Sequence, residues 1–151
     1  MKNILKSFLS IAIASLATNG LMAQETKAAD HAAHAGHSLK AYVAVADSLY
    51  KDDLGKAKKA ATGIIEVDAN GALAKSAKSV ADAKDIAAAR EAFKTLSADA
   101  VKLAKMHKVD GYTVMACPMV KDGKGVWLSA DSKVNNPYFG AKMAHCGGPK
   151  K

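Results

Sequence analysis

The sequence is poor in the residues that catalytic and redox sites need. It has only two cysteines, Cys117 and Cys146, and no Cys-x-x-Cys pair, so thioredoxin-like thiol exchange is not indicated. No motif of a Ser, His and carboxylate set is recognisable. A copper oxidase needs a permanent His-rich site, and beyond residue 38 the chain offers only His107 and His145. We therefore expect a protein that is not an enzyme.

Long hydrophobic runs are also scarce. The one apolar run, Ile4 to Leu16, follows a lysine and is shorter than the roughly 20 residues that a transmembrane helix needs. Small residues follow it up to Ala23, which is typical of a secretory signal over residues 1–23. No cysteine stands at the cleavage point, so we expect no lipid anchor and no membrane span. The predicted location is a periplasm, where thiols are oxidised.

Aromatic residues are few, at 5% of the chain, and they do not alternate with blocks of basic residues. The formal net charge is +8, of which Lys2 and Lys6 in the predicted signal contribute two. The remaining lysines are scattered among acidic residues, which is typical of a solvated surface. An exported chain also rarely meets nucleic acid, so a nucleic-acid partner is not expected.

Helical periodicity is the main feature that the sequence does contain. Apolar residues recur at spacings of three and four, which places them on one face of a helix. Polar residues 24–38 lack such a stripe and are predicted to form a flexible leader. We expect an all-α fold for residues 39–151, an antiparallel bundle of about four helices with short connections. The predicted helices lie near 39–50, 57–65, 73–81 and 85–108.

The helical period ends after Val109. Glycine, proline, asparagine and aspartate interrupt the chain there, so we expect an irregular C-terminal cap over residues 109–148. Within it, residues 126–128 are predicted to form a short strand or an apolar plug. Residues 138–144 are predicted to form one or two helical turns.

The cap collects the sulfur atoms of the chain. Both cysteines and three of the six methionines lie within it. Cys117 and Met119 are two residues apart, and Met143 and Cys146 would share one side of a helical turn. Thiol and thioether donors select Cu(I) over Mg(II), Ca(II) or Mn(II), so the predicted ligands of a Cu(I) site are these four residues. Further candidate donors are His145, Met106, His107 and Met115.

Two other interpretations of the cysteines stay open. Paired cysteines in an exported domain most often form a disulfide, and a bridge between Cys117 and Cys146 would stabilise the fold by roughly 3 kcal/mol. Zn(II) is a second alternative, with His145 and His107 beside the two cysteines, although the usual C-x2-C spacing is missing. A disulfide and Cu(I) binding can also coexist, if the resting bridge is reduced when the metal arrives.

The predicted leader contains the remaining three histidines, His31, His34 and His37. Such a tract gathers Cu(II), Ni(II) or Zn(II) in some proteins and is a solvated spacer in others, and both alternatives stay open. Arg90, the only arginine, is predicted to pair with an acid or to bind backbone carbonyls of the cap. Trp127 is predicted to fill the core.

The motifs of the cap carry a resemblance to a known family. In order they are Cys-Pro-Met at 117–119, Trp-Leu-Ser at 127–129, Asn-Pro-Tyr-Phe-Gly at 136–140 and Met-x-x-Cys-Gly at 143–147. Residues 90–97 add Arg-x-x-Phe-x-x-Leu-Ser. The chain resembles, over roughly residues 39–148, a family of exported proteins, mostly from Bacteroidetes, that is described as a domain of unknown function.

That resemblance implies a small helical bundle, found alone or attached to the periplasmic adaptor subunits of copper and silver efflux pumps. It implies copper handling, with Cys117, Met119, Met143 and Cys146 at the matching positions. His145 is an additional donor inside the last motif. We therefore expect a Cu(I)-binding protein that buffers the ion or delivers it to an efflux system.

Overall fold

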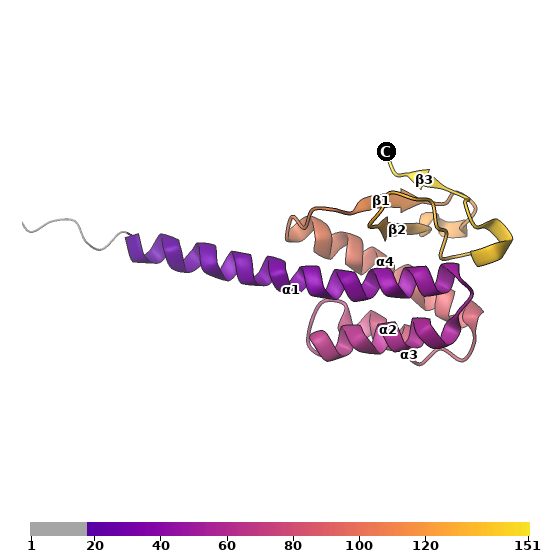
Figure 1. Ribbon diagram of the computed structural model, residues 1–151, viewed down its shortest axis with the longest axis horizontal. Coiled ribbons are helices and arrows are strands. Elements are labelled where there is room, and N and C mark those ends of the chain that lie inside the picture. The colour runs from indigo at the N-terminus through magenta and orange to yellow at the C-terminus, as the bar shows by residue number, and fades with distance from the viewer. Residues whose placement is uncertain (1–17) are drawn as a thin grey trace, which may run out of the picture.

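The computed structural model describes the backbone of residues 18–151. It describes the burial of side chains from residue 31 onward, except at position 122. Four helices are followed by a small sheet (Figure 1). The helices are α1 (Thr18–Tyr50), α2 (Leu54–Val67), α3 (Ala74–Ala81) and α4 (Ile86–Met106). The strands are β1 (Thr113–Ala116), β2 (Val126–Ser129) and β3 (Gly148–Pro149), and short 3-10 helices lie at Lys121–Gly123 and Gly140–Met143.

The four predicted helices are all present, and their ends have local causes. Helix α2 begins after Asp53, whose Oδ1 accepts a hydrogen bond of 2.9 Å from the Lys56 N–H. Helix α4 begins after Asp85 in the same way, with 2.8 Å between Oδ1 and the Ala88 nitrogen. Each carboxylate satisfies a backbone donor that the first helical turn leaves free. The predicted start of α4 near residue 85 is therefore confirmed, whereas α2 begins three residues before its predicted start at 57.

Helix α1 differs from its prediction. It runs without interruption from Thr18, so residues 24–38 are helical and the predicted helix start at Leu39 is wrong. Alanine has the highest helix propensity, and this segment contains no proline to stop the helix. Ala35 and Ser38 are already buried against the bundle. Residues 1–17 of the predicted signal lie outside the described part of the chain. Cleavage after Ala23, a position within α1, stays a prediction.

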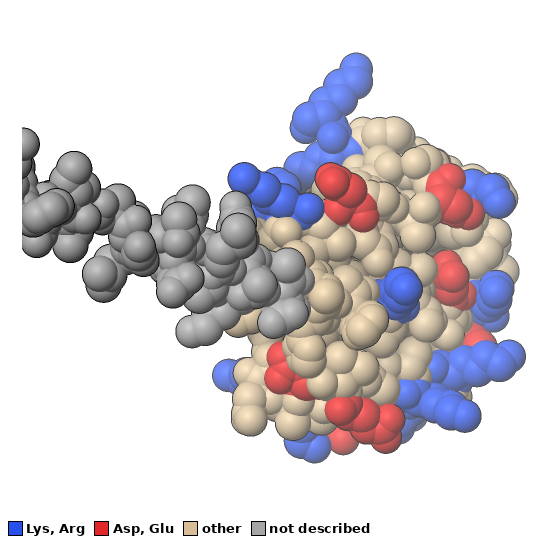
Figure 2. Space-filling model, turned by 60° about the vertical axis from the view of Figure 1, so that its left-hand side comes forward, with Lys and Arg blue, Asp and Glu red and all other residues tan. Residues whose placement is uncertain are grey.

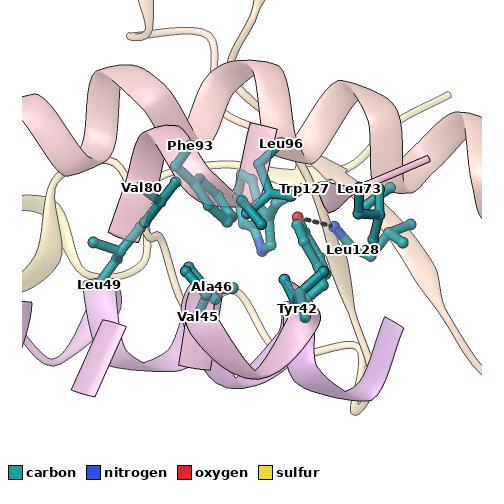
Figure 3. Packing of buried hydrophobic residues seen from close by; sticks show 14 of the residues in the cluster. Tyr42, Val45, Ala46, Leu49, Leu73, Val80, Phe93, Leu96, Trp127 and Leu128 are labelled. Carbon is teal, nitrogen blue, oxygen red and sulfur yellow. Dashed lines mark hydrogen bonds between the residues drawn. The ribbon is translucent and has the colours of Figure 1, made fainter. Parts of the chain in front are cut away.

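The core lies between α1, α4 and β2 (Figure 3). Tyr42 of α1 stacks on Phe93 of α4 with 5.4 Å between the ring centroids. Trp127 of β2 is only 1% exposed and meets Tyr138 edge-on. Its predicted role as a core residue is confirmed. Figure 1 shows the sheet on the opposite side of α4 from α2 and α3.

The predicted irregular cap is wrong, because its backbone forms a three-stranded sheet in the order β2-β1-β3. Both strand pairs are antiparallel, with Met115 opposite Trp127 on one side and Ala116 opposite Gly148 on the other. The strand predicted at 126–128 is confirmed as β2. Strands of two and four residues are too short to show the alternation that marks a strand in a sequence.

Hydroxyl groups of α1, α4 and the C-terminal turn bind the edge of β2. The Tyr42 hydroxyl accepts the Leu128 N–H at 3.2 Å and lies 2.6 Å from the Ser97 hydroxyl. Ser97 donates to the Val126 carbonyl at 2.5 Å, and Tyr138 donates to the same oxygen. Burial raises the pKa of both tyrosines, so they remain protonated donors. These bonds fix the sheet on the helices.

Arg90 joins the start of α4 to the end of α1 and to the cap. Its Nη2 lies 2.5 Å from Asp52 Oδ1 and donates to the Leu49 carbonyl at 2.8 Å. Its Nε donates to the Pro137 carbonyl at 3.0 Å. Asp52 in turn accepts the Ala141 N–H at 3.0 Å. The predictions that Arg90 pairs with an acid and binds cap carbonyls are both confirmed.

This ion pair lies directly on Gly140. A Cβ atom at that position would come within 2.3 Å of Arg90 Nη2 and 2.4 Å of Asp52 Oδ1. The backbone there also has φ +53°, a conformation that favours glycine. The glycine that ends the Asn-Pro-Tyr-Phe-Gly motif is therefore required by the ion pair.

Stability should depend on acid pH through Asp52. The Ala141 N–H and the Arg90 guanidinium hold the pKa of this carboxyl below its usual value. The stabilisation is complete above the unfolded pKa of about 3.9 and is lost as the pH falls through the lower folded pKa. We expect Asp52→Asn to cost about 1 kcal/mol at pH 7, since a side chain that is 43% exposed is screened by solvent.

Urea unfolding between pH 2 and 6 measures this effect. The loss of stability below pH 4 should be shallower for Asp52→Asn than for the parent. Asp110→Asn, which changes an exposed carboxylate, is the control and should follow the parent. Identical slopes for the parent and Asp52→Asn would show that the ion pair contributes nothing to acid sensitivity.

Charged side chains are distributed over the surface. Figure 2 shows lysine and arginine interspersed with aspartate and glutamate on the face in view. Several of the surface charges form local pairs, such as Lys78 with Asp82 at 2.9 Å and Lys56 with Asp53 at 3.0 Å. This distribution agrees with the solvated lysine surface predicted from the sequence. Within residues 18–151, no helix has the length and apolar character to cross a membrane.

Candidate dithiol site

The fold brings the two cysteines into contact. Cys117 follows β1 directly and Cys146 lies two residues before β3, and the pairing of Ala116 with Gly148 places them at the same end of the ladder. Their Sγ atoms are 3.2 Å apart. Cys117 is buried, whereas Cys146 is half-buried and reachable from solvent. The site is thus a dithiol with one protected and one accessible sulfur.

The distance between the two sulfur atoms is longer than in a disulfide and shorter than in a metal site with two thiolate ligands. A disulfide bond is about 2.05 Å long. Two sulfurs bound to one tetrahedral metal ion at 2.3 Å are about 3.8 Å apart. At 3.2 Å the two free thiols, Cys117 and Cys146, are within about 1 Å of both arrangements. The site can therefore form a bridge or bind a soft metal ion after a small movement.

Cys117 is held by the loop that leads into β2. Its N–H donates to the Gly125 carbonyl at 2.8 Å, and its own carbonyl accepts the Val120 N–H at 3.4 Å. A Cβ atom at Gly125 would lie 2.7 Å from the Cys117 carbonyl and 2.6 Å from the Val120 Cβ. The close return of this loop fixes the backbone of Cys117.

Cys146 is held by a fully buried asparagine. The side chain of Asn136 donates to the Cys146 carbonyl at 2.7 Å and accepts the Tyr138 N–H at 2.8 Å. Gly147 follows at φ +127°, where a Cβ atom would lie 2.6 Å from the Ala116 carbonyl. The sequence showed Asn136 only as part of a turn and a family motif, so its role as the support of Cys146 was missed.

The contact with Cys117 affects the ionisation of the Cys146 thiol. The hydrogen bond with Cys117 favours the protonated form of Cys146 and, together with burial, raises the pKa of the Cys146 thiol. The Met119 N–H, which faces the same sulfur, acts in the opposite direction. A metal ion that binds here must displace protons, so its affinity should increase with pH.

The methionines occupy four different environments. Met119 is 57% exposed, and its backbone N–H contacts the Cys146 sulfur. Met143 is half-buried in the 3-10 turn before Cys146, whose N–H donates to the Met143 carbonyl at 3.1 Å. Met115 is fully buried in the core, and Met106 is exposed at the far end of α4. The backbone thus places Met119 and Met143 next to the dithiol.

His145 is exposed beside Cys146. Its Nδ1 lies 2.8 Å from the Val134 carbonyl, which only accepts, so Nδ1 carries the proton. The Nε2 lone pair is therefore free. His107 lies ten residues, or about 15 Å along α4, beyond Ser97, which binds the Val126 carbonyl opposite Ala116, and it does not reach the dithiol. Among the described residues no three His, Cys, Asp or Glu side chains already converge on one metal position.

A groove opens beside Met119. It has a volume of about 450 Å³ and is lined by Met119, Tyr138 and Phe139, with Lys121 and Lys142 among the residues at its sides. The sequence contained no signal for this groove, because its residues come from separate parts of the chain. Its position gives the Met119 side chain free space in which to move.

Comparison with known families gives a match over the helical part of the chain. Residues 38–111 match the family described as Protein of unknown function (DUF3347). The DUF3347 match covers slightly under half of the chain, from the middle of α1 to just before β1. It supports the expected relation to a domain-of-unknown-function family. Both cysteines lie beyond its C-terminal end.

The description of the matched family names no activity, so only the chemistry of the two thiols and their neighbours indicates what the site does. Comparisons with curated proteins and with solved structures found no match.

Proposed function

We propose that the protein binds Cu(I) in a periplasm and buffers it or delivers it to a heavy-metal efflux system. The observation that carries this proposal is the contact of Cys117 Sγ with Cys146 Sγ at 3.2 Å beside Met119. Two sulfurs from distant parts of the chain meet at the surface of the cap. Soft donors of this kind favour Cu(I) over hard cations.

In this proposal Cys117 and Cys146 are the charged ligands. Met119 and Met143 complete a neutral thioether shell, and His145 offers its free Nε2 as a substitute donor. Because Cys146 and Met119 are accessible from solvent, an ion bound here can be passed to another protein. Buried ligands on all sides would instead favour permanent retention.

The efflux assignment rests on the resemblance of the cap motifs to exported proteins that occur attached to copper and silver efflux adaptors. It defines the proposed partner as a periplasmic component that accepts Cu(I) through sulfur ligands. The secretory signal predicted from the sequence of residues 1–23 supports the proposed location.

A second candidate function uses the same contact differently. Two thiols 3.2 Å apart in an oxidising compartment readily form a disulfide. The protein would then be a structural or interaction module that Cys117 and Cys146 hold closed, and the cap would bind a protein partner. In a third alternative, the two cysteines and His145 bind Zn(II), and the bound ion stabilises the domain. Counting the free thiols of the untreated protein separates the disulfide from the metal-binding proposals.

Cu(I) affinity should depend on both cysteines. We expect the reduced protein to bind one Cu(I) and the variant Cys117→Ser, Cys146→Ser to bind at least a hundredfold more weakly, because both anionic ligands are gone. Anaerobic titration against a colorimetric Cu(I) chelator measures the affinity. Equal affinity of parent and variant would exclude a copper site in the cap.

The methionine ligands are tested in the same titration. Met119→Leu with Met143→Leu should lower the affinity about tenfold, whereas Met106→Leu at the distant end of α4 is the matched control. Loss of Cu(I) affinity in the control would mean that the ion binds elsewhere.

A further inference from the structure

A second group of donors lies at the other end of the bundle. A cavity of about 290 Å³ lies among α1, the end of α2, the start of α3 and the end of α4. Three histidines and one aspartate are among its lining residues, namely His31, His34, His107 and Asp68. Its floor is apolar, with Ile64, Leu73 and Leu103. None of these polar residues belongs to the dithiol site.

The polar residues already form two close pairs. His34 Nε2 lies 3.6 Å from Asp68 Oδ2. The rings of His31 and His107 meet edge to face with 6.3 Å between their centroids. The three histidines therefore come from two helices that are far apart in the sequence, and the carboxylate comes from the end of a third.

The spacing of histidines on α1 explains which of them take part. His31 and His34 are three residues apart and lie on one side of the helix. His37 continues the same spacing, but at 100° per residue it points about 120° away from His31. It is exposed and is not among the residues that line the cavity. His37 thus provides a control residue of the same type on the same helix.

We propose that this cavity binds a divalent transition-metal ion of the zinc class through His31, His34 and His107, with Asp68 as the fourth donor. Imidazole nitrogen and carboxylate oxygen suit Zn(II), Ni(II) and Cu(II), whereas Cu(I) prefers the sulfur atoms of the cap. The four side chains do not yet converge on one position, and because His31 and His34 are exposed, their rings are free to turn toward a shared ion. Binding joins α1 to the ends of α2 and α4.

This site is independent of the proposed copper site. His107 lies ten residues, or about 15 Å along α4, from Ser97, whose hydroxyl binds the Val126 carbonyl opposite Ala116, the residue before Cys117. The two sites also use different donor atoms. An experiment on a variant without cysteines therefore tests the histidine site alone, whatever the result for Cu(I).

The experiment uses Zn(II) alone as the probe and the purified Cys117→Ser, Cys146→Ser protein as the background. Competition with a chromophoric zinc chelator should show one bound ion. Adding His31→Ala, His34→Ala and His107→Ala should weaken binding at least a hundredfold, and Asp68→Asn alone should weaken it about tenfold. His37→Ala should bind as the background does. Zn(II) should also raise the Tm of the background and not that of the triple histidine variant.

Two results would overturn the proposal. The first is unchanged affinity in the triple histidine variant while circular dichroism shows that it is folded. The second is an equal loss of affinity in His37→Ala, because binding would then belong to an exposed histidine tract and not to the cavity. Co(II) in place of Zn(II) provides a further check, since its absorption spectrum should indicate nitrogen and oxygen ligands in tetrahedral geometry.

Discussion

Replacing Trp127 with alanine is expected to lower the free energy of unfolding by about 3–5 kcal/mol. The indole is the largest fully buried side chain of the described core. Tyr138 contacts it edge-on with 6.2 Å between the ring centroids, and the backbone of Gly147 passes close to its outer ring atoms. Removing the indole leaves a cavity in the core that α1, α4 and the sheet enclose (Figure 3), and the surrounding backbone can close it only in part.

Urea unfolding followed by circular dichroism measures this loss. Trp127→Phe retains an aromatic ring and should lose clearly less stability than Trp127→Ala. Val67→Ala, at a side chain that is 39% exposed, is the surface control and should change stability by less than about 0.5 kcal/mol. A loss below about 1 kcal/mol for Trp127→Ala would mean that the cap contributes little to the stability of the bundle.

Replacing Asn136 with alanine is expected to cost about 3–4 kcal/mol, because two buried backbone groups lose their partner at once. These groups are the Cys146 carbonyl and the Tyr138 N–H, at 2.7 Å and 2.8 Å from the amide of a side chain that is fully buried. Water cannot replace the amide without opening the cap. The change should also free the backbone of Cys146 and so separate the two thiols.

Asn135 is the matched control for this prediction. It is the same residue type one position earlier and is only half-buried, so Asn135→Ala should cost less than about 0.5 kcal/mol. Thermal unfolding of the two variants, together with the rate at which Cys117 and Cys146 oxidise to a disulfide, gives the comparison. Equal stability of the two variants would refute the role assigned to Asn136.

The helices could be predicted because their signals are local. Asp53 and Asp85 supply N-caps within three residues of the groups that they bind, and the apolar stripes of α2 and α4 repeat at helical spacing. The start of α1 was misplaced because residues 24–38 carry no apolar stripe at helical spacing. Residues 24–38 are helical through alanine propensity, and within them Ala35 and Ser38 are buried.

The sheet and the details of the dithiol depend on contacts between distant residues. Strand β1 has no alternating pattern of its own and pairs with β3 more than thirty residues later. The proximity of Cys117 and Cys146 was predicted from chemistry, since two exported cysteines tend to meet. Their support by Asn136 and Gly147 depends on hydrogen bonds and close approaches that spacing in the sequence does not contain.

The three hydroxyl groups along β2 have a consequence for how the molecule behaves at high concentration. An open sheet edge is a template on which another copy adds a strand, and this is a common start of aggregation. Here Tyr42, Ser97 and Tyr138 already occupy the outward Leu128 N–H and Val126 carbonyl. The opposite edge is the two-residue strand β3, where Pro149 has no N–H to offer. Both edges of the small sheet are thereby closed to growth from one molecule to the next.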